Sequence, residues 1–204
     1  MDLKEFDDIR PYNDSEVEDA LLRIASNPLF ENISKYLFPT KSADYLKSIL
    51  LSCKTTRDFQ VNVMSVIVSK ILADTAKKLT ADGLEYFKDD KKYLLLSNHR
   101  DIVLDSAIIQ LIFYRYGLQT TQIAVGDNLI TSLFIEDIAR TNKMIKVVRE
   151  VTAKELYMSS KKLSDYIRHS ITGNRSSIWI AQRNGRTKDG VDVTEQGVLK
   201  MLSM

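Results

Sequence analysis

The pattern of apolar and polar residues changes near residue 90 of the chain. Before that point, apolar residues recur mainly at intervals of three and four, which predicts helices. The predicted helices span 15–26, 42–53 and 58–79. Pro28 and Pro39 lie between them, where proline interrupts helical structure. We therefore expect residues 1–88 to form a helical, bundle-like region with a scaffolding role.

After residue 89, short apolar runs alternate with amphipathic segments. The predicted strands are 93–97, 121–125, 144–148 and 177–181, and the predicted helices lie near 102–117, 129–141 and 152–172. Strands separated by helices of this length favour an α/β fold with a mainly parallel sheet covered by helices. Residues 89–204 are therefore predicted to form a second domain after the helical region, with the hinge inside 81–92.

Polar residues follow each predicted strand. They are Asn98 and His99 after the first strand, 126–128 after the second, Arg149 after the third and 182–190 after the fourth. Ligands of open parallel sheets bind at the carboxyl ends of the strands. We therefore expect these polar residues to share one edge of the sheet and to form the functional site.

The composition narrows the class of protein. A chain of 204 residues with 44% hydrophobic residues can bury one sizeable core. The single cysteine, Cys53, excludes an internal disulfide, and no paired Cys/His spacing suggests a metal site, which favours a reducing compartment. The amino terminus has no features of a signal peptide, and no window approaches the roughly 20 apolar residues of a membrane-spanning helix. We expect a soluble or peripheral protein without a bound metal.

Charge is unevenly distributed along the chain. Residues 140–190 hold 12 Lys/Arg against 4 Asp/Glu, a net charge of +8. Because the whole chain has a net charge of +2, the remaining residues have a net charge of −6. Such a segment indicates an anionic partner, although a solvated basic face is an equally plain explanation. Glycine-rich nucleotide motifs are absent, and the basic residues are not interleaved with exposed aromatic residues, which argues against nucleotide and nucleic-acid partners.

His99 is one of two histidines in the chain, and two acids, Asp101 and Asp105, follow it closely. Asp101 suits the N-cap of the next helix, and Asp105 suits the positive end of that helix dipole. Either acid could also accept a hydrogen bond from the His99 ring and so orient it as a general base. Because the chain has no G-x-S-x-G motif, such a base would take its proton from a substrate hydroxyl.

Three segments, in order, resemble the sequence blocks of the glycerolipid acyltransferase family, which includes glycerol-3-phosphate and 1-acylglycerol-3-phosphate acyltransferases. NHR followed by Asp105 is similar to the first block, His-x-x-x-x-Asp after an apolar strand. Residues 126–150, which begin GDNL, are similar to the second block, and WIAQRNGRTKDG at 179–190 is similar to the third.

The resemblance implies transfer of a fatty acyl group, in phospholipid synthesis, from a thioester of acyl carrier protein or coenzyme A to glycerol 3-phosphate or 1-acylglycerol 3-phosphate. His99 would act as the general base, and Asp105 would orient it. The residues implied for binding the substrate phosphate are Arg149, Arg183, Arg186 and Lys188. Gly126 and Asn128 would form a turn at the acceptor site.

The same resemblance implies no bound cofactor beyond the acyl thioester substrate and no nucleic-acid partner. It places the protein in the cytoplasm, peripheral on the inner face of the cell membrane, where its lipid substrates lie. The alternative is a non-catalytic α/β protein that binds anionic lipid or phosphate with the same basic residues.

The chain departs from the family pattern at three places. Five residues, not four, separate His99 from Asp105, so the turn contains a bulge or Asp101 is the orienting acid; we favour Asp105 because Asp101 also suits the N-cap. Asn184 stands where the family usually carries Glu. The fourth block, an apolar strand with a proline, is absent, and we expect the acyltransferase domain to be incomplete at its carboxyl end.

Overall fold

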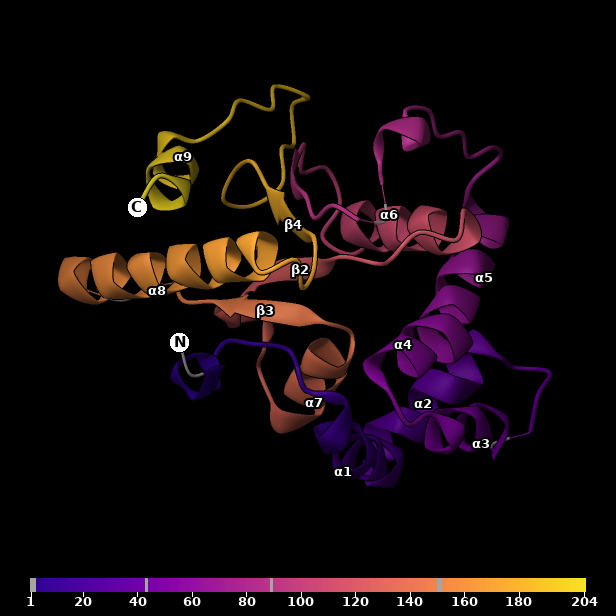
Figure 1. Ribbon diagram of the computed structural model, residues 1–204. Helices are drawn as coiled ribbons and strands as arrows, with labels where there is room; N and C mark the ends of the chain where they lie inside the picture. The colour runs from indigo at the N-terminus through magenta and orange to yellow at the C-terminus, as the bar shows by residue number, and fades with distance from the viewer. Residues whose placement is uncertain (1–2, 43, 89, 150–151) are drawn as a thin grey trace. The chain divides into compact units, whose positions relative to one another are not determined.

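The computed structural model describes residues 3–42, 44–88, 90–149 and 152–204, and these residues form two compact units (Figure 1). The sheet unit comprises Met1–Arg10, Thr80–Leu129 and Ile145–Met204. The helical unit comprises Pro11–Leu79 and Ile130–Met144. The division into these two units does not test whether separate domains meet between residues 88 and 89, so that boundary stays a prediction.

Within the described residues, the sheet unit contains a four-stranded, all-parallel sheet in the order β1-β4-β2-β3. The strands are β1 (Leu94–Ser97), β2 (Gln122–Gly126), β3 (Met144–Val147) and β4 (Ile178–Ala181). Each coincides within one residue with a predicted strand, and the predicted α/β class is confirmed. Ile178 of β4 lies opposite Leu94 on one side and Gln122 on the other, so β4 is an inner strand.

The helices of the sheet unit follow the order expected for strands joined by helical connections. They are η1 (Leu3–Phe6), η3 (Leu84–Tyr86), α6 (Leu104–Arg115), η4 (Asp127–Leu129), α8 (Ala153–Thr172) and α9 (Gln196–Leu202). Thr152 caps α8 in a capping box with Glu155, and Gly173 ends it, so the helix agrees with the one predicted near 152–172. In Figure 1, α8 is the long orange helix beside β3.

The two faces of the sheet carry different side chains. On β4, Ile178 and Ile180 are buried in an apolar core with residues of α8 and α9, among them Leu163 and Met201. Because successive side chains of a strand point to opposite faces, Trp179 points to the other face. Residues that follow β4 can therefore reach either face of the same sheet edge.

The helical unit is built around a separate apolar core. Its elements are α1 (Asp14–Ser26), α2 (Pro28–Leu37), α3 (Asp44–Ser52), α4 (Thr56–Asp58), η2 (Phe59–Met64), α5 (Ser65–Thr75) and α7 (Leu133–Thr141). Leu21, Leu46 and Val63 lie in this core together with Phe134 of α7. A helix that the sequence places between two strands of the sheet thus contributes to the core of the helical unit.

Two details of the helical unit differ from the sequence prediction. The single helix expected at 58–79 is instead α4, a π-helical stretch at Phe59–Met64, and α5, which ends at Thr75. The exposed, lysine-containing residues after Thr75 have no apolar partner that would prolong the helix. Pro28 does lie between two helices, but the segment that follows it is itself a helix that was not expected: Pro28 occupies the first turn of α2, where its missing N–H has no cost and Asn27 provides the cap.

Among the described residues, none of the helices combines the length and the apolar character needed to cross a membrane.

Candidate active site

The turn between β1 and α6 brings His99 into contact with Asp105. The distance from His99 Nδ1 to Asp105 Oδ2 is 3.0 Å, and the side chains are only 14% and 20% exposed. The same oxygen of Asp105 accepts the backbone N–H groups of Arg100 and Asp101, at 2.7 and 3.0 Å. An ionised carboxylate can only accept, so in a neutral imidazole this contact favours the tautomer with the proton on Nδ1 and the lone pair on Nε2.

Asp101 has a different position in this turn. The N-cap of α6 is Val103 and not Asp101, the residue that the sequence predicted, because the helix begins only at Leu104. Asp101 Oδ1 instead accepts the backbone N–H groups of Val103 at 2.9 Å and Leu104 at 2.7 Å in the turn before the helix. These hydrogen bonds, that of Leu104 foremost, lower the pKa of Asp101. The additional residue between His99 and Asp105 is therefore accommodated in a turn that Asp101 stabilises, while Asp105 contacts the imidazole.

The loop that follows β4 packs against the backbone of His99. The N–H of His99 donates to Asp192 Oδ2 at 2.6 Å, and its carbonyl accepts the N–H of Thr187 at 2.8 Å. The ring of Trp179 lies edge-on to the imidazole, with ring centroids 6.5 Å apart. The first and third sequence blocks are thus joined through one residue, and the imidazole lies on the Trp179 face of the sheet.

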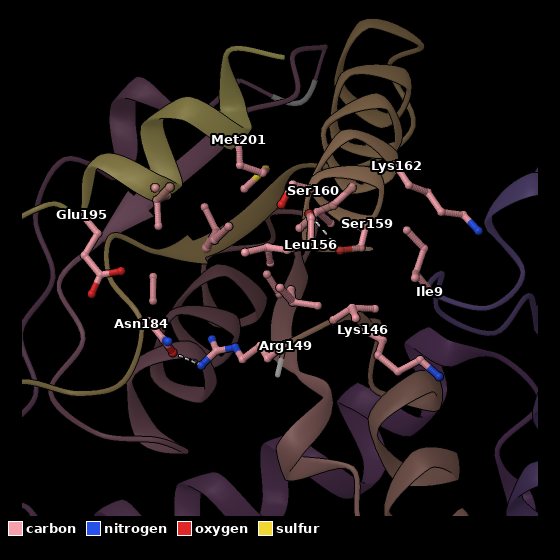
Figure 2. A pocket seen from close by; sticks show the side chains of 18 of the residues that line it. Ile9, Lys146, Arg149, Leu156, Ser159, Ser160, Lys162, Asn184, Glu195 and Met201 are labelled. Atoms are coloured by element: carbon pink, nitrogen blue, oxygen red, sulfur yellow. Dashed lines mark hydrogen bonds between the residues drawn. The ribbon is translucent and has the colours of Figure 1, made fainter. Parts of the chain in front are cut away.

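Arg149 connects the second and third blocks after β3. Its guanidinium donates to the side-chain oxygen of Asn184, and its backbone N–H donates to Asp127 Oδ1 at 3.1 Å (Figure 2). The Arg149 side chain also passes close to Gly126. A Cβ atom built on Gly126 would lie 2.7 Å from Arg149 Nε and would also collide with the side chain of Asn128. Gly126 is therefore required at this position to leave room for the guanidinium.

The neutral partner of Arg149 has an electrostatic consequence. Asn184 orients the guanidinium without adding a negative charge, and among the described residues no carboxylate forms an ion pair with Arg149. The positive charge of Arg149 is thus available to an anion. Asn184 therefore accepts a hydrogen bond from Arg149 as a neutral amide, at the position where the family usually carries Glu.

The three other predicted phosphate-binding residues lie in the loop after β4. Arg183 donates from NH1 to the carbonyl of Val191 at 3.2 Å, and its buried Nε has no hydrogen-bond partner within the described part of the chain. Arg186 is exposed and close enough to Asp101 to contribute to its lowered pKa. Lys188 is exposed in the same loop. In the described residues, no hydrogen bond joins Arg186 or Lys188 to Arg149.

Two acids of this region have contacts that sequence reasoning did not identify, although Asp127 lies within the predicted segment 126–128. Asp127 holds the backbone at Arg149, and Asp192 holds the backbone at His99. Asp127 directly follows β2, whereas Asp192 lies farther along the loop after β4, and the hydrogen-bonding partner of each is distant in sequence. A search for groups of three or more His, Cys, Asp or Glu side chains that could hold a metal found none among the described residues.

Comparison with known proteins places this geometry in a family. A search of curated proteins found no match to the chain. The family model described as Acyltransferase matches residues 78–196, a segment that contains His99, Arg149 and Arg183. This match supports a general acyltransferase role. Because it covers more than half of the chain, the protein belongs to the glycerolipid acyltransferase family.

Proposed function

We propose that the protein transfers a fatty acyl group from a thioester of acyl carrier protein or coenzyme A to a hydroxyl of glycerol 3-phosphate or 1-acylglycerol 3-phosphate. The observation that carries this proposal is the contact between His99 Nδ1 and Asp105 Oδ2 at the end of β1. It supplies an imidazole with Nε2 available as a base, beside a basic region suited to a phosphate.

The reaction proceeds in one displacement at the thioester carbonyl. His99 Nε2 removes the proton of the acceptor hydroxyl as its oxygen attacks the carbonyl carbon. The carbon–sulfur bond then breaks, and the departing sulfur takes the proton from the imidazolium, so the products are an ester and a thiol. Asp105 keeps the proton on Nδ1 and stabilises the imidazolium by its negative charge. No acyl-enzyme forms, because the hydroxyl that attacks belongs to the acceptor.

Arg149 and Arg183 are proposed to bind the acceptor phosphate, with Arg186 and Lys188 contributing from the same loop. Arg149 has no ion-pairing acid among the described residues, and Arg183 has a buried N–H without a partner. A phosphate dianion provides several acceptor oxygens, and guanidinium groups can replace its water by charge-assisted hydrogen bonds. The protein would work without a bound cofactor, peripheral to the inner face of the cell membrane, where the acceptor and product lie.

The proposal is tested by offering a radiolabelled fatty acyl thioester, of acyl carrier protein and of coenzyme A separately, with each of the two acceptors. We expect label to enter the glycerolipid product with at least one combination of donor and acceptor. If no combination transfers label while the protein still binds inorganic phosphate, the non-catalytic alternative, an anion-binding α/β protein, replaces the proposal.

Replacing Gly126 with alanine should weaken phosphate binding more than it affects folding. The new Cβ would collide with the side chain of Arg149, which can rotate away into solvent at little cost to the fold. Losing one charge-assisted guanidinium contact costs about 1.5–3 kcal/mol, or roughly 10- to 150-fold in affinity. Calorimetric titration with glycerol 3-phosphate measures the effect, and thermal unfolding is the control. An unchanged dissociation constant would show that Arg149 does not hold the phosphate.

A further inference from the structure

A cavity of about 270 Å³ lies in the sheet unit between the sheet, α8 and α9. Its apolar wall includes Ile9, Val147, Leu163, Ile180, Val198 and Met201. The volume is close to the lower end of the roughly 300–1,000 Å³ found for sites that bind drug-sized ligands. Figure 2 shows its lining side chains, with Leu156 and Met201 at the helical side.

One end of the cavity carries the two guanidinium groups already described. Arg149 and Arg183 are both among the lining residues, together with Asn184, which holds Arg149. In Figure 2, Arg149 and Asn184 lie together at the edge of the apolar side chains. Arg183 contributes a second guanidinium to the cavity lining, and this group donates from NH1 to the carbonyl of Val191. Although Glu195 also lines the cavity, the two guanidinium groups leave a net positive charge, and an occupant that combines an anionic group with an aliphatic group would match this polarity.

The cavity and the imidazole of His99 lie on opposite faces of the sheet. Ile180 lines the cavity, whereas Trp179, its neighbour in β4, faces the His99 ring. His99 and Asp105 are not among the cavity residues. The cavity lining thus includes the arginines proposed to bind phosphate and not the proposed base.

From this arrangement we propose that the cavity holds the fatty chain of a monoacyl acceptor whose phosphate binds Arg149 and Arg183. The inference rests on the proposed function, and it names 1-acylglycerol 3-phosphate, and not glycerol 3-phosphate, as the class of acceptor. In such a molecule the fatty chain, the reacting hydroxyl and the phosphate are on three consecutive glycerol carbons, with the hydroxyl on the middle one. The phosphate and chain can therefore enter together while the hydroxyl remains at the sheet edge.

The donor's fatty chain fits this cavity less well. Its first carbon is the carbonyl under attack, which must lie within about 3–3.5 Å of the acceptor oxygen that His99 deprotonates. A cavity for that chain should begin at His99, on the Trp179 face. The observed cavity is lined by the guanidinium groups and not by His99, so it matches a chain that is attached to the phosphate-bearing molecule.

The inference is tested by equilibrium binding in the absence of donor, with 1-acylglycerol 3-phosphates of increasing chain length as the probes. We expect affinity to rise by roughly fourfold for each added methylene group until the cavity is filled, and glycerol 3-phosphate to bind much more weakly. An affinity that does not depend on chain length, or equal binding of glycerol 3-phosphate, would overturn the inference.

A cavity-filling variant provides an independent measurement. Gly197 of α9 lines the cavity, and a Cβ atom built there meets nothing within 4 Å, so Gly197→Leu adds volume without a backbone clash. We expect it to weaken binding of the monoacyl probe by about tenfold or more relative to its effect on glycerol 3-phosphate. The matched control is Gln196→Leu, an exposed neighbour that is not among the lining residues and should change neither constant.

Transfer assays separate the failure of this inference from the failure of the proposed function. Chain-dependent binding without transfer to any acceptor would support the cavity assignment and overturn the proposed function. Transfer to glycerol 3-phosphate, together with binding that does not depend on chain length, would support the proposed function and overturn the cavity assignment. If Gly197→Leu instead raises the KM for the acyl thioester and leaves acceptor binding unchanged, the cavity belongs to the donor and the inference is wrong.

Discussion

Replacing His99 with alanine should lower the rate of acyl transfer by roughly 100- to 10,000-fold, the usual contribution of a positioned general base. The reason is that Nε2 of His99 is the proposed acceptor of the hydroxyl proton, with its ring held by Asp105 and its backbone by Asp192. Transfer of radiolabelled acyl groups at saturating acceptor measures the loss. Binding of glycerol 3-phosphate should change little, because the guanidinium groups are on other segments.

The two acids of the turn provide a matched pair of variants that tests how His99 is oriented. Asp105→Asn keeps an oxygen for the N–H groups of Arg100 and Asp101 but removes the negative charge that raises the basicity of the imidazole and stabilises the imidazolium. We expect a loss of the same order as for His99→Ala. Asp101→Asn should retain the hydrogen bonds to the N–H groups of Val103 and Leu104, since an amide oxygen can also accept them, and transfer should fall by no more than a few-fold.

Either of two results would contradict this assignment. A His99→Ala protein that folds normally and keeps its transfer rate would exclude His99 as the base. A larger loss in Asp101→Asn than in Asp105→Asn would make Asp101 the orienting acid. Circular dichroism of each variant is the control for folding, and the His99→Ala, Asp105→Asn double variant should be hardly slower than either single one, because the two residues act as a unit.

The second large effect is expected on the stability of the helical unit, at a buried acid that the sequence did not reveal. Asp137 of α7 is fully buried and accepts two hydrogen bonds from Arg23 of α1, at 2.9 and 2.7 Å, and one from Tyr12 at 2.8 Å. These hydrogen bonds raise the pKa of Arg23. Burial and the hydrogen bond with Asp137 raise that of Tyr12.

Arg23→Met is expected to lower the free energy of unfolding by about 3 kcal/mol or more, because it leaves the carboxylate of Asp137 buried without its cation. The side chain of Arg23 is 44% exposed whereas that of Asp137 is 1% exposed, so the cost arises mainly from the acid. Urea unfolding monitored by circular dichroism measures it. The double variant Arg23→Met, Asp137→Leu should recover much of the loss, since an apolar pair of similar size needs no charge compensation.

An exposed ion pair of the same unit serves as the control. Lys35 and Glu31 are one turn apart on α2, with side chains 63% and 60% exposed, so Lys35→Met should change stability by less than about 1 kcal/mol. If Arg23→Met were no more costly than Lys35→Met, the ion pair of Asp137 would not be a structural determinant of the helical unit.

Local features of the fold were predictable because they depend on neighbouring residues. The four strands, the cap of α8 at Thr152 and its end at Gly173 follow from apolar periodicity and from side chains that bond to the backbone within a few residues. The π-helical stretch within 58–79 and the start of α2 at Pro28 were not predicted. In both cases the apolar pattern is compatible with several helical boundaries, and packing decides among them.

The sequence by itself determined the α/β class, the order of strands and helices, and which residues could carry the chemistry, because hydrophobic periodicity and residue type are local properties. Only the tertiary structure decided that Asp105 contacts the imidazole, that Asn184 holds Arg149 across 35 residues, and that Asp192 holds His99 across 93. It also placed Phe134 in the core of the helical unit. These pairings depend on the strand order β1-β4-β2-β3 and on packing between distant segments, which no local pattern specifies.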